Sequence, residues 1–93
     1  MNHALITGAS AGIGEAFARL LAEQGFNLVI VARREERLRE LAGELTHNFD
    51  VSVTPLTADL ADPNAPAELT RQLDELAIRP QVLINNAGFS IRE

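Results

Sequence analysis

Short apolar runs and longer stretches with helical spacing follow one another along the chain. The apolar runs are residues 3–7, 28–32 and 82–84, while a fourth, 51–56, alternates and contains a proline. The continuous run 28–32 is rich in β-branched residues, which indicates a strand that is covered on both faces, as in a parallel sheet. Because proline cannot donate to a sheet ladder, the run with Pro55 is predicted to be an edge strand.

Three stretches between these runs have the i, i+3, i+4 spacing of amphipathic helices. The first extends from Gly12 to Gln24, and Gly25 is expected to end it in a left-handed conformation. The second extends from Glu35 to Thr46, and the start of the third lies within a few residues of Asp62-Pro63 and Pro66. The predicted inner residues are Phe17, Leu20 and Leu21, then Leu38, Leu41, Ala42 and Leu45, then Leu69, Leu73 and Leu76, with Glu15, Arg19 and Glu23 outside the first helix.

Strands and helices alternate in the order βαβαβαβ, which predicts an α/β fold. Right-handed crossovers favour a parallel, Rossmann-like sheet with strand order 3-2-1-4. The chain changes direction across the sheet between the third and fourth strands. A ligand is therefore expected in the crevice at the carboxyl ends of the first and fourth strands.

A glycine-rich turn joins the first strand to the first helix. Residues 7–14 read TGASAGIG, with the spacing G-x-x-x-G-x-G. Gly8 allows a tight turn, Gly12 lets a phosphate approach the backbone, and Gly14 lets the helix pack close to the strand. Backbone N–H groups and a helix N-terminus converge there, which suits a nucleotide phosphate. The alternative is an ordinary turn made of small residues.

Three motifs carry a resemblance to a known family. Residues 7–14 resemble the cofactor motif of the short-chain dehydrogenase/reductase family, and Asn85-Asn86-Ala87-Gly88 resembles its second signature. Asp59-Leu60 resembles the adenine-contacting pair. The resemblance covers the first part of the family's fold and implies a partial, truncated dinucleotide-binding (Rossmann) domain over residues 1–93. Gln81 departs from the aspartate that is common in the family, which puts one structural contact in doubt.

The resemblance also implies roles for individual residues. The Asp59 carboxylate would accept the adenine amino group, with help from the Leu60 backbone, and residues 86–88 would pass the ribose side. Ile13 would lend an N–H to the pyrophosphate while its side chain joins the core, and Asn85 would tie strands together. The expected cofactor-binding residues are Gly8, Ser10, Ala11, Gly12, Ile13, Gly14, Arg33, Arg34, Asp59, Leu60, Asn86, Ala87 and Gly88.

Arg33 and Arg34 stand where dinucleotide folds place the residue that reads the adenosine ribose. An acidic residue there would repel a 2′-phosphate, whereas an arginine can pair with it. No Asp or Glu occurs between Gly25 and Arg34. This charge pattern predicts NADP rather than NAD, with Arg33 the stronger ligand. The alternative is a solvated arginine pair, although cations at a helix N-terminus oppose the macrodipole. In the family an arginine inside the glycine motif often assists; this chain has Ala11 there, which leaves Arg33, Arg34 and the Ser10 hydroxyl to meet the phosphate.

Composition limits the chemistry. The net charge of −5 argues against nucleic-acid binding through a basic surface. Without cysteine there is no thiol chemistry, and His3 and His47 do not form a metal pair. The chain has no tyrosine and no lysine, whereas the family relies on Tyr-x-x-x-Lys and a serine that Ser90 does not match. No catalytic residue is therefore assigned. The sequence predicts the NADP(H)-binding portion of an oxidoreductase for a carbonyl/alcohol pair. The alternative is a non-catalytic fragment that binds a dinucleotide or serves in folding or assembly.

Location and partners follow from the same patterns. No signal peptide or membrane-length apolar run is visible, so a cytoplasmic location without a membrane partner is expected. The fourth strand, 82–84, is apolar and uncharged, and an open edge of this kind invites pairing with another chain. The sequence therefore predicts self-association through this edge or the uncovered sheet face beside it.

Overall fold

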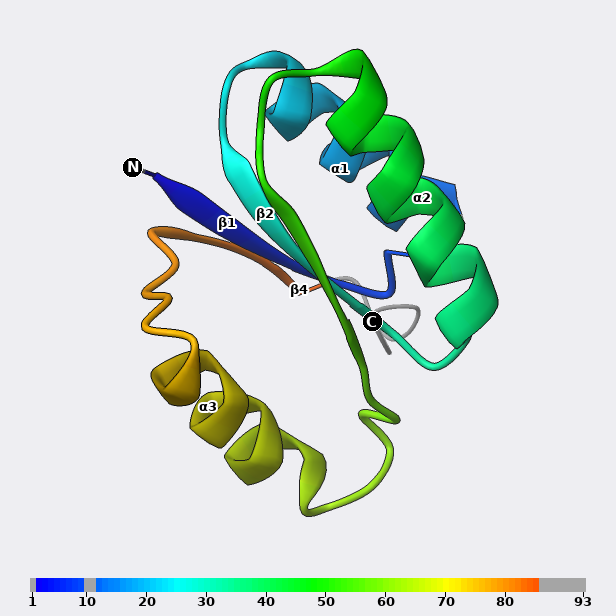
Figure 1. Cartoon of the computed structure of the whole chain (residues 1–93). Coiled ribbons are helices and arrows are strands. Elements are labelled where there is room, and N and C mark those ends of the chain that lie inside the picture. The colour runs from blue at the N-terminus through cyan, green and yellow to red at the C-terminus, as the bar shows by residue number, and fades with distance from the viewer. Residues whose placement is uncertain (1, 10–11, 86–93) are drawn as a thin grey trace.

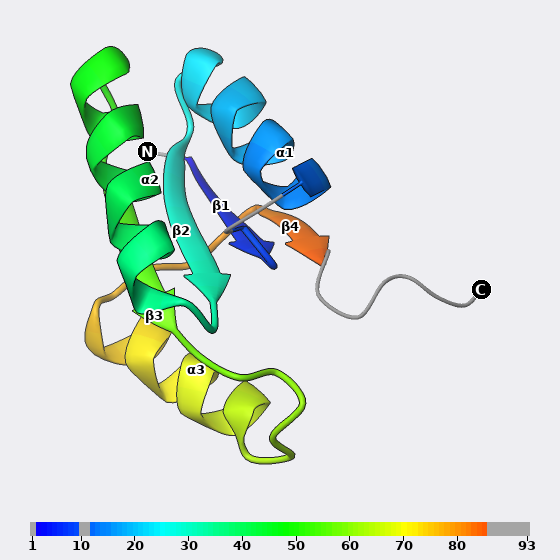
Figure 2. The ribbon, with the colours of Figure 1, turned by 90° about the vertical axis from the view of Figure 1, so that its right-hand side faces the viewer.

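The computed structural model describes residues 2–9 and 12–85, which form three layers (Figure 1). A four-stranded parallel sheet has helices α1 and α2 on one face and α3 on the other, as Figures 1 and 2 show. The strand order β3-β2-β1-β4 confirms the predicted Rossmann-like α/β fold. The elements are β1 (His3–Thr7), α1 (Gly12–Glu23), β2 (Asn27–Ala32), α2 (Glu35–Asn48), β3 (Val53–Thr57), α3 (Ala65–Glu75) and β4 (Val82–Asn85).

The two faces of the sheet carry cores of different size. All six residues of β2 are buried because helices cover both of its faces. On the α1/α2 face, Ile6 and Ile30 belong to a cluster that includes the predicted inner residues of α2. On the α3 face the cluster is small, and Leu83 of β4 is 62% exposed. The inner residues of α2, all buried, are Leu38, Leu41, Ala42 and Leu45.

The face of α1 that packs on the sheet differs from the predicted one. Its buried residues are Gly14, Ala18 and Ala22, and of the predicted inner face only Leu21 packs against the core. Small side chains bring the helix close to the sheet, and the larger ones then lie to one side. The predicted core position of the Ile13 side chain is therefore wrong. The exposed residues, called here the α1 stripe, are Ile13, Phe17 and Leu20, with exposed fractions of 57%, 37% and 47%.

The α3 region confirms one prediction and corrects another. Helix α3 begins at Ala65, with Pro66 in its first turn, where a missing N–H costs no helical hydrogen bond. Leu69 is buried in the cluster on this face of the sheet, and Leu73 packs against the same cluster. Leu76, however, is the C-cap and is 48% exposed, so its predicted inner position is wrong because the helix ends before it. Strand β3 lies at the edge of the sheet, as its proline predicted.

Candidate functional site

The glycine turn lies between the end of β1 and the start of α1, at the carboxyl edge of the sheet. Gly8 has φ +65° and Gly12 has φ +60°, both in the left-handed region where glycine carries little cost. A Cβ on Gly12 would meet no atom within 4 Å, so the backbone there is open. Gly14 is buried in the first turn of α1. Ser10-Ala11 lies outside the described residues. An open turn before a helix N-terminus fits a phosphate group.

The ends of β1 and β4 meet beside this turn, as the strand order predicted. Thr7 pairs with Asn85, and the Thr7 hydroxyl donates to Asn85 Oδ1 at 3.1 Å, so Asn85 ties the two strands together. At their other ends, Gln81 Oε1 accepts from the His3 N–H at 2.9 Å. The departure from the family pattern at Gln81 thus keeps a link between the strands. The other residues of the second signature, Asn86, Ala87 and Gly88, lie outside the described residues.

Arg33 and Arg34 follow β2 at the same edge and are exposed. Arg34 is the N-cap of α2, and its side chain makes no capping hydrogen bond. Neither guanidinium forms a salt bridge with any of residues 2–9 or 12–85, so both are free to meet an anion. Within the described ranges, the arginines that form salt bridges are Arg19, Arg37, Arg39 and Arg71.

A cluster of ion pairs joins α1 to α2, and sequence reasoning did not find it. Glu15 accepts from Arg37 at 2.6 Å and from Arg19 at 2.9 Å, and Arg19 also reaches Glu44 at 2.9 Å. The hydrogen bond from Arg37, followed by that from Arg19, lowers the pKa of Glu15. The i,i+4 spacing of Glu15 and Arg19 was a visible signal. The link to Arg37 depends on how the helices pack.

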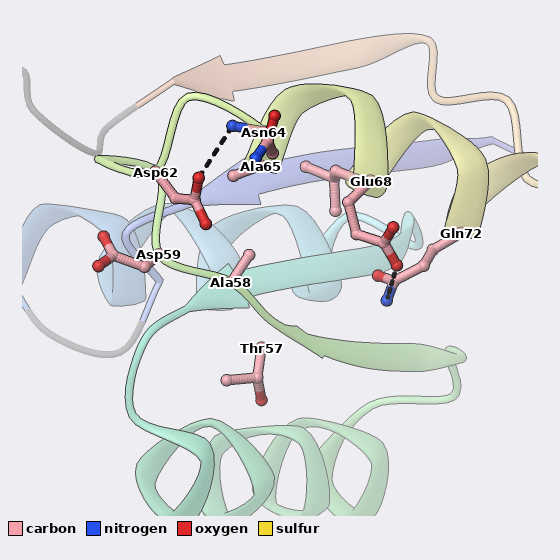
Figure 3. A pocket seen from close by; sticks show the side chains of 9 residues that line it. Thr57, Ala58, Asp59, Asp62, Asn64, Ala65, Glu68 and Gln72 are labelled. Carbon is pink, nitrogen blue, oxygen red and sulfur yellow. Dashed lines mark hydrogen bonds between the residues drawn. The ribbon is translucent and has the colours of Figure 1, made fainter.

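A pocket of about 250 Å³ lies between the end of β3 and the start of α3 (Figure 3). Asp59 and Gln72 lie at its opposite ends, and Leu60 follows Asp59 in the loop. Asp59 Oδ1 accepts from the Ala61 N–H at 3.0 Å, which leaves its second oxygen for another donor. Asp62 accepts from the Asn64 N–H at 2.9 Å and so shapes the turn before α3. The carboxylates that line the pocket disfavour a phosphate there and suit a group that donates hydrogen bonds.

The described part of the chain contains neither a metal-binding cluster nor a helix that could span a membrane. No group of three or more His, Asp or Glu side chains among residues 2–9 and 12–85 could hold a metal ion. Within the same ranges, no helix has the length and apolar character needed to cross a bilayer.

The fold and the turn define the class of this protein. A parallel sheet of order 3-2-1-4, with an open glycine turn and exposed arginines at the carboxyl ends of its strands, is a nucleotide-binding α/β arrangement. The family model for short chain dehydrogenase matches residues 2–93, and the chain belongs to that family.

Similar proteins include reductases and dehydrogenases of that family. Sulfoacetaldehyde reductase 2 of Chromohalobacter salexigens is 42% identical over 87 residues, which are 94% of this chain and 34% of the relative. A short-chain dehydrogenase of Sphingobium yanoikuyae in complex with NADPH has a TM-score of 0.86 and 43% identity over 100% of this chain and 36% of that one. L-sorbose reductase of Gluconobacter frateurii, complexed with NADPH and L-sorbose, has a TM-score of 0.88 and 36% identity over 99% and 35%. The chain thus spans about a third of their length.

Proposed function

We propose that this chain is the NADP(H)-binding portion of an oxidoreductase that acts on a carbonyl/alcohol pair. The observation that carries the proposal is the free pair Arg33 and Arg34, at the edge of the sheet that also holds the open glycine turn. A guanidinium pairs well with a phosphate, and these two have no salt-bridge partner among the described residues. Two similar structures hold NADPH, which supports the same preference here.

In the proposed site, different residues at the carboxyl ends of the strands bind different parts of the dinucleotide. The glycine turn, with the N–H of Ile13, would bind the pyrophosphate, and Arg33 with Arg34 would bind the 2′-phosphate. Asp59 would accept from the adenine amino group through its second carboxylate oxygen, beside the Leu60 backbone. The bound nicotinamide would supply hydride transfer; the chain's own residues bind and orient it. The proposed contacts in full are Gly8, Ser10, Ala11, Gly12, Ile13, Gly14, Arg33, Arg34, Asp59, Leu60, Asn86, Ala87 and Gly88.

Calorimetric titration with NADPH and NADH tests the proposal. The wild-type chain should bind NADPH more tightly, and Arg33→Asp should remove that preference because the 2′-phosphate then faces a carboxylate. Arg79→Asp makes the same change of charge just before β4, at the amino ends of the strands and therefore away from the proposed site. It should leave the preference for NADPH intact. Equal affinities in the wild type, or an equal loss in both variants, would overturn the assignment.

The alternative is a dinucleotide-binding module without catalysis. These 93 residues contain no tyrosine and no lysine, so we expect no turnover from them alone. Positioned acid–base groups contribute about 10²–10⁴-fold to such reactions. We also propose a cytoplasmic location for this protein.

We also propose that the chain associates with a second copy of itself. The α1 stripe lies on the side of α1 opposite Glu15 and Arg19, which face α2. Because α2 packs over β2 and β3, that side of α1 is turned toward β4. On the other face of β4, Leu83 is 62% exposed, and β4 pairs only with β1 in the described sheet. An open apolar edge beside an apolar stripe favours pairing between copies.

A further inference from the structure

The Glu15–Arg37 ion pair lies at the edge of the sheet that carries the proposed cofactor site. Glu15 is in the first turn of α1, and Arg37 is the third residue of α2. The two helices follow the carboxyl ends of the adjacent parallel strands β1 and β2, so their first turns meet at one edge. The pair therefore connects the helix that follows the glycine turn to the helix that follows Arg33 and Arg34.

We propose that Glu15 is a positioning residue for recognition of the 2′-phosphate. By accepting from Arg37, it holds the first turn of α2, and with it the two free arginines, at a fixed distance from the glycine turn. This inference rests on the proposed NADP(H) function and adds to it a residue that does not itself contact the cofactor.

The need for such a link follows from the ligand. The pyrophosphate and the 2′-phosphate of NADP are joined through one ribose, so their two binding sites must keep a fixed separation. The segment 33–36 is exposed, and the N-cap side chain of Arg34 makes no capping hydrogen bond. The Leu38 N–H donates to the Arg34 carbonyl at 3.1 Å, but this bond lies within α2 and does not reach α1. The Glu15–Arg37 pair, at 2.6 Å and part-buried, does reach it.

A second bridge between the same helices offers a matched control. Arg19 of α1 reaches Glu44 of α2 at 2.9 Å. Glu44 lies in the second half of α2, away from the turn that carries Arg33 and Arg34. If cofactor preference depended only on contact between the helices, loss of either bridge should reduce it. If Glu15 positions the 2′-phosphate site, only loss of the Glu15 bridge should.

The sign of the effect separates positioning from simple electrostatics. Glu15 is an anion near a proposed phosphate site, so its removal should by charge alone strengthen binding of the extra phosphate of NADPH. Positioning predicts the opposite change. Because NADPH and NADH share the pyrophosphate, the ratio of their dissociation constants isolates the 2′-phosphate.

The experiment titrates NADPH and NADH into the wild-type chain, Glu15→Ala and Glu44→Ala. We expect Glu15→Ala to lower the preference for NADPH about three- to tenfold, in the range of couplings between neighbouring residues, and Glu44→Ala to leave it unchanged. Hydrogen exchange of the cofactor-free chains gives an independent reading: the Leu38 amide, which donates to the Arg34 carbonyl across the first turn of α2, should exchange faster in Glu15→Ala and at the wild-type rate in Glu44→Ala.

The outcomes distinguish this inference from the function on which it rests. A wild type without preference for NADPH would defeat the proposed function and the inference together. The inference alone would be defeated if the wild type prefers NADPH but Glu15→Ala leaves that preference unchanged or raises it. An equal loss of preference in Glu44→Ala would have the same consequence. If Glu15→Ala did not fold, the milder Glu15→Gln would be measured in its place, with the same expected direction and Glu44→Gln as its control.

Discussion

Single residues fix the backbone where helices end and turns begin. Gly25 follows α1 with φ +93°, and its N–H donates to the Ala22 carbonyl at 3.0 Å, which closes the helix. Ala77 follows α3 with φ 58°, so a residue with a side chain takes the left-handed conformation there. Gly43, in contrast, lies inside α2, where no turn requires it. The same residue type therefore has opposite effects on stability at two positions.

Replacing Gly25 and Gly43 by alanine should change the free energy of unfolding in opposite directions. Gly25→Ala should lower the free energy of unfolding by about 1–2 kcal/mol, since a Cβ is strained in the left-handed region. Gly43→Ala should raise it by about 0.5–1 kcal/mol, because alanine is the better helix former. A new Cβ meets no atom within 4 Å at either position, so backbone conformation alone separates the two. Urea unfolding measures both, and changes of the same sign would contradict the assignment.

Glu15 makes stability depend on pH. Its pKa is lowered, first by the hydrogen bond from Arg37 and then by that from Arg19. A carboxyl with a lowered folded-state pKa stabilises the fold above its unfolded value, about 4.3, and loses that contribution as pH falls through the lower folded value. Glu15→Gln should therefore cost about 1 kcal/mol at pH 7, and the difference from the wild type should shrink below about pH 4.3. A difference that stays constant down to about pH 3 would exclude this ionisation as the cause.

At the scale of the elements, the seating of α1 has the largest consequence. Its sheet-facing side carries Gly14, Ala18 and Ala22, while larger apolar residues lie on the side turned toward β4. Helical spacing alone fits both sides, since the apolar residues extend more than halfway round the helix. The close approach of α1 to the sheet requires the small residues to face inward.

The seating of α1 predicts which substitutions the chain tolerates. Ala18 is 0% exposed, so Ala18→Leu should overpack the core and cost about 1–3 kcal/mol. Leu20 is 47% exposed, so Leu20→Gln should change the stability of the monomer by less than about 0.5 kcal/mol. Chemical denaturation in dilute solution, where self-association is weak, tests both. A larger loss of stability for Leu20→Gln than for Ala18→Leu would contradict this seating. It would instead support the inner face that helical spacing alone predicts.

At the scale of the whole molecule, the described sheet is covered unevenly. The cluster on the α1/α2 face is large, whereas the cluster on the α3 face includes a single buried residue from a helix, Leu69, among the residues described. Leu83 and the α1 stripe expose apolar surface on opposite faces of the β4 side. Burial of each such side chain is worth roughly 1.5–3 kcal/mol, which is large beside a typical total stability of ~5–15 kcal/mol.

Self-association should therefore depend on β4 and on the α1 stripe. Light scattering after size exclusion, over a series of concentrations, should show a mass that rises toward a dimer for the wild type. Leu83→Lys and Phe17→Glu should each shift the chain toward the monomer, whereas Leu76→Lys, at an exposed position beyond the end of α3, should not. A wild type that stays monomeric at high concentration would contradict the proposal.

The order of the elements, the buried β2, the inner face of α2 and the place of the glycine turn can all be predicted from the sequence. These features depend on local patterns: apolar runs, helical spacing and glycine positions bounded by strand and helix. The strand order followed as well, because crossover handedness leaves few arrangements of βαβ units. The motifs of Gly8–Gly14 and Asp59-Leu60 also indicated the family, because their residue types and spacing are visible in the chain itself.

Three other features cannot be predicted from local patterns: the side of α1 that faces the sheet, the end of α3 relative to Leu76, and the choice of arginines that form salt bridges among the described residues. These outcomes depend on contacts between residues far apart in the chain, such as Arg37 with Glu15 and Gln81 with His3. A helix with apolar residues on two sides has no local signal that selects one of them. The distance between helix and sheet selects it, and that distance is a property of the packed molecule.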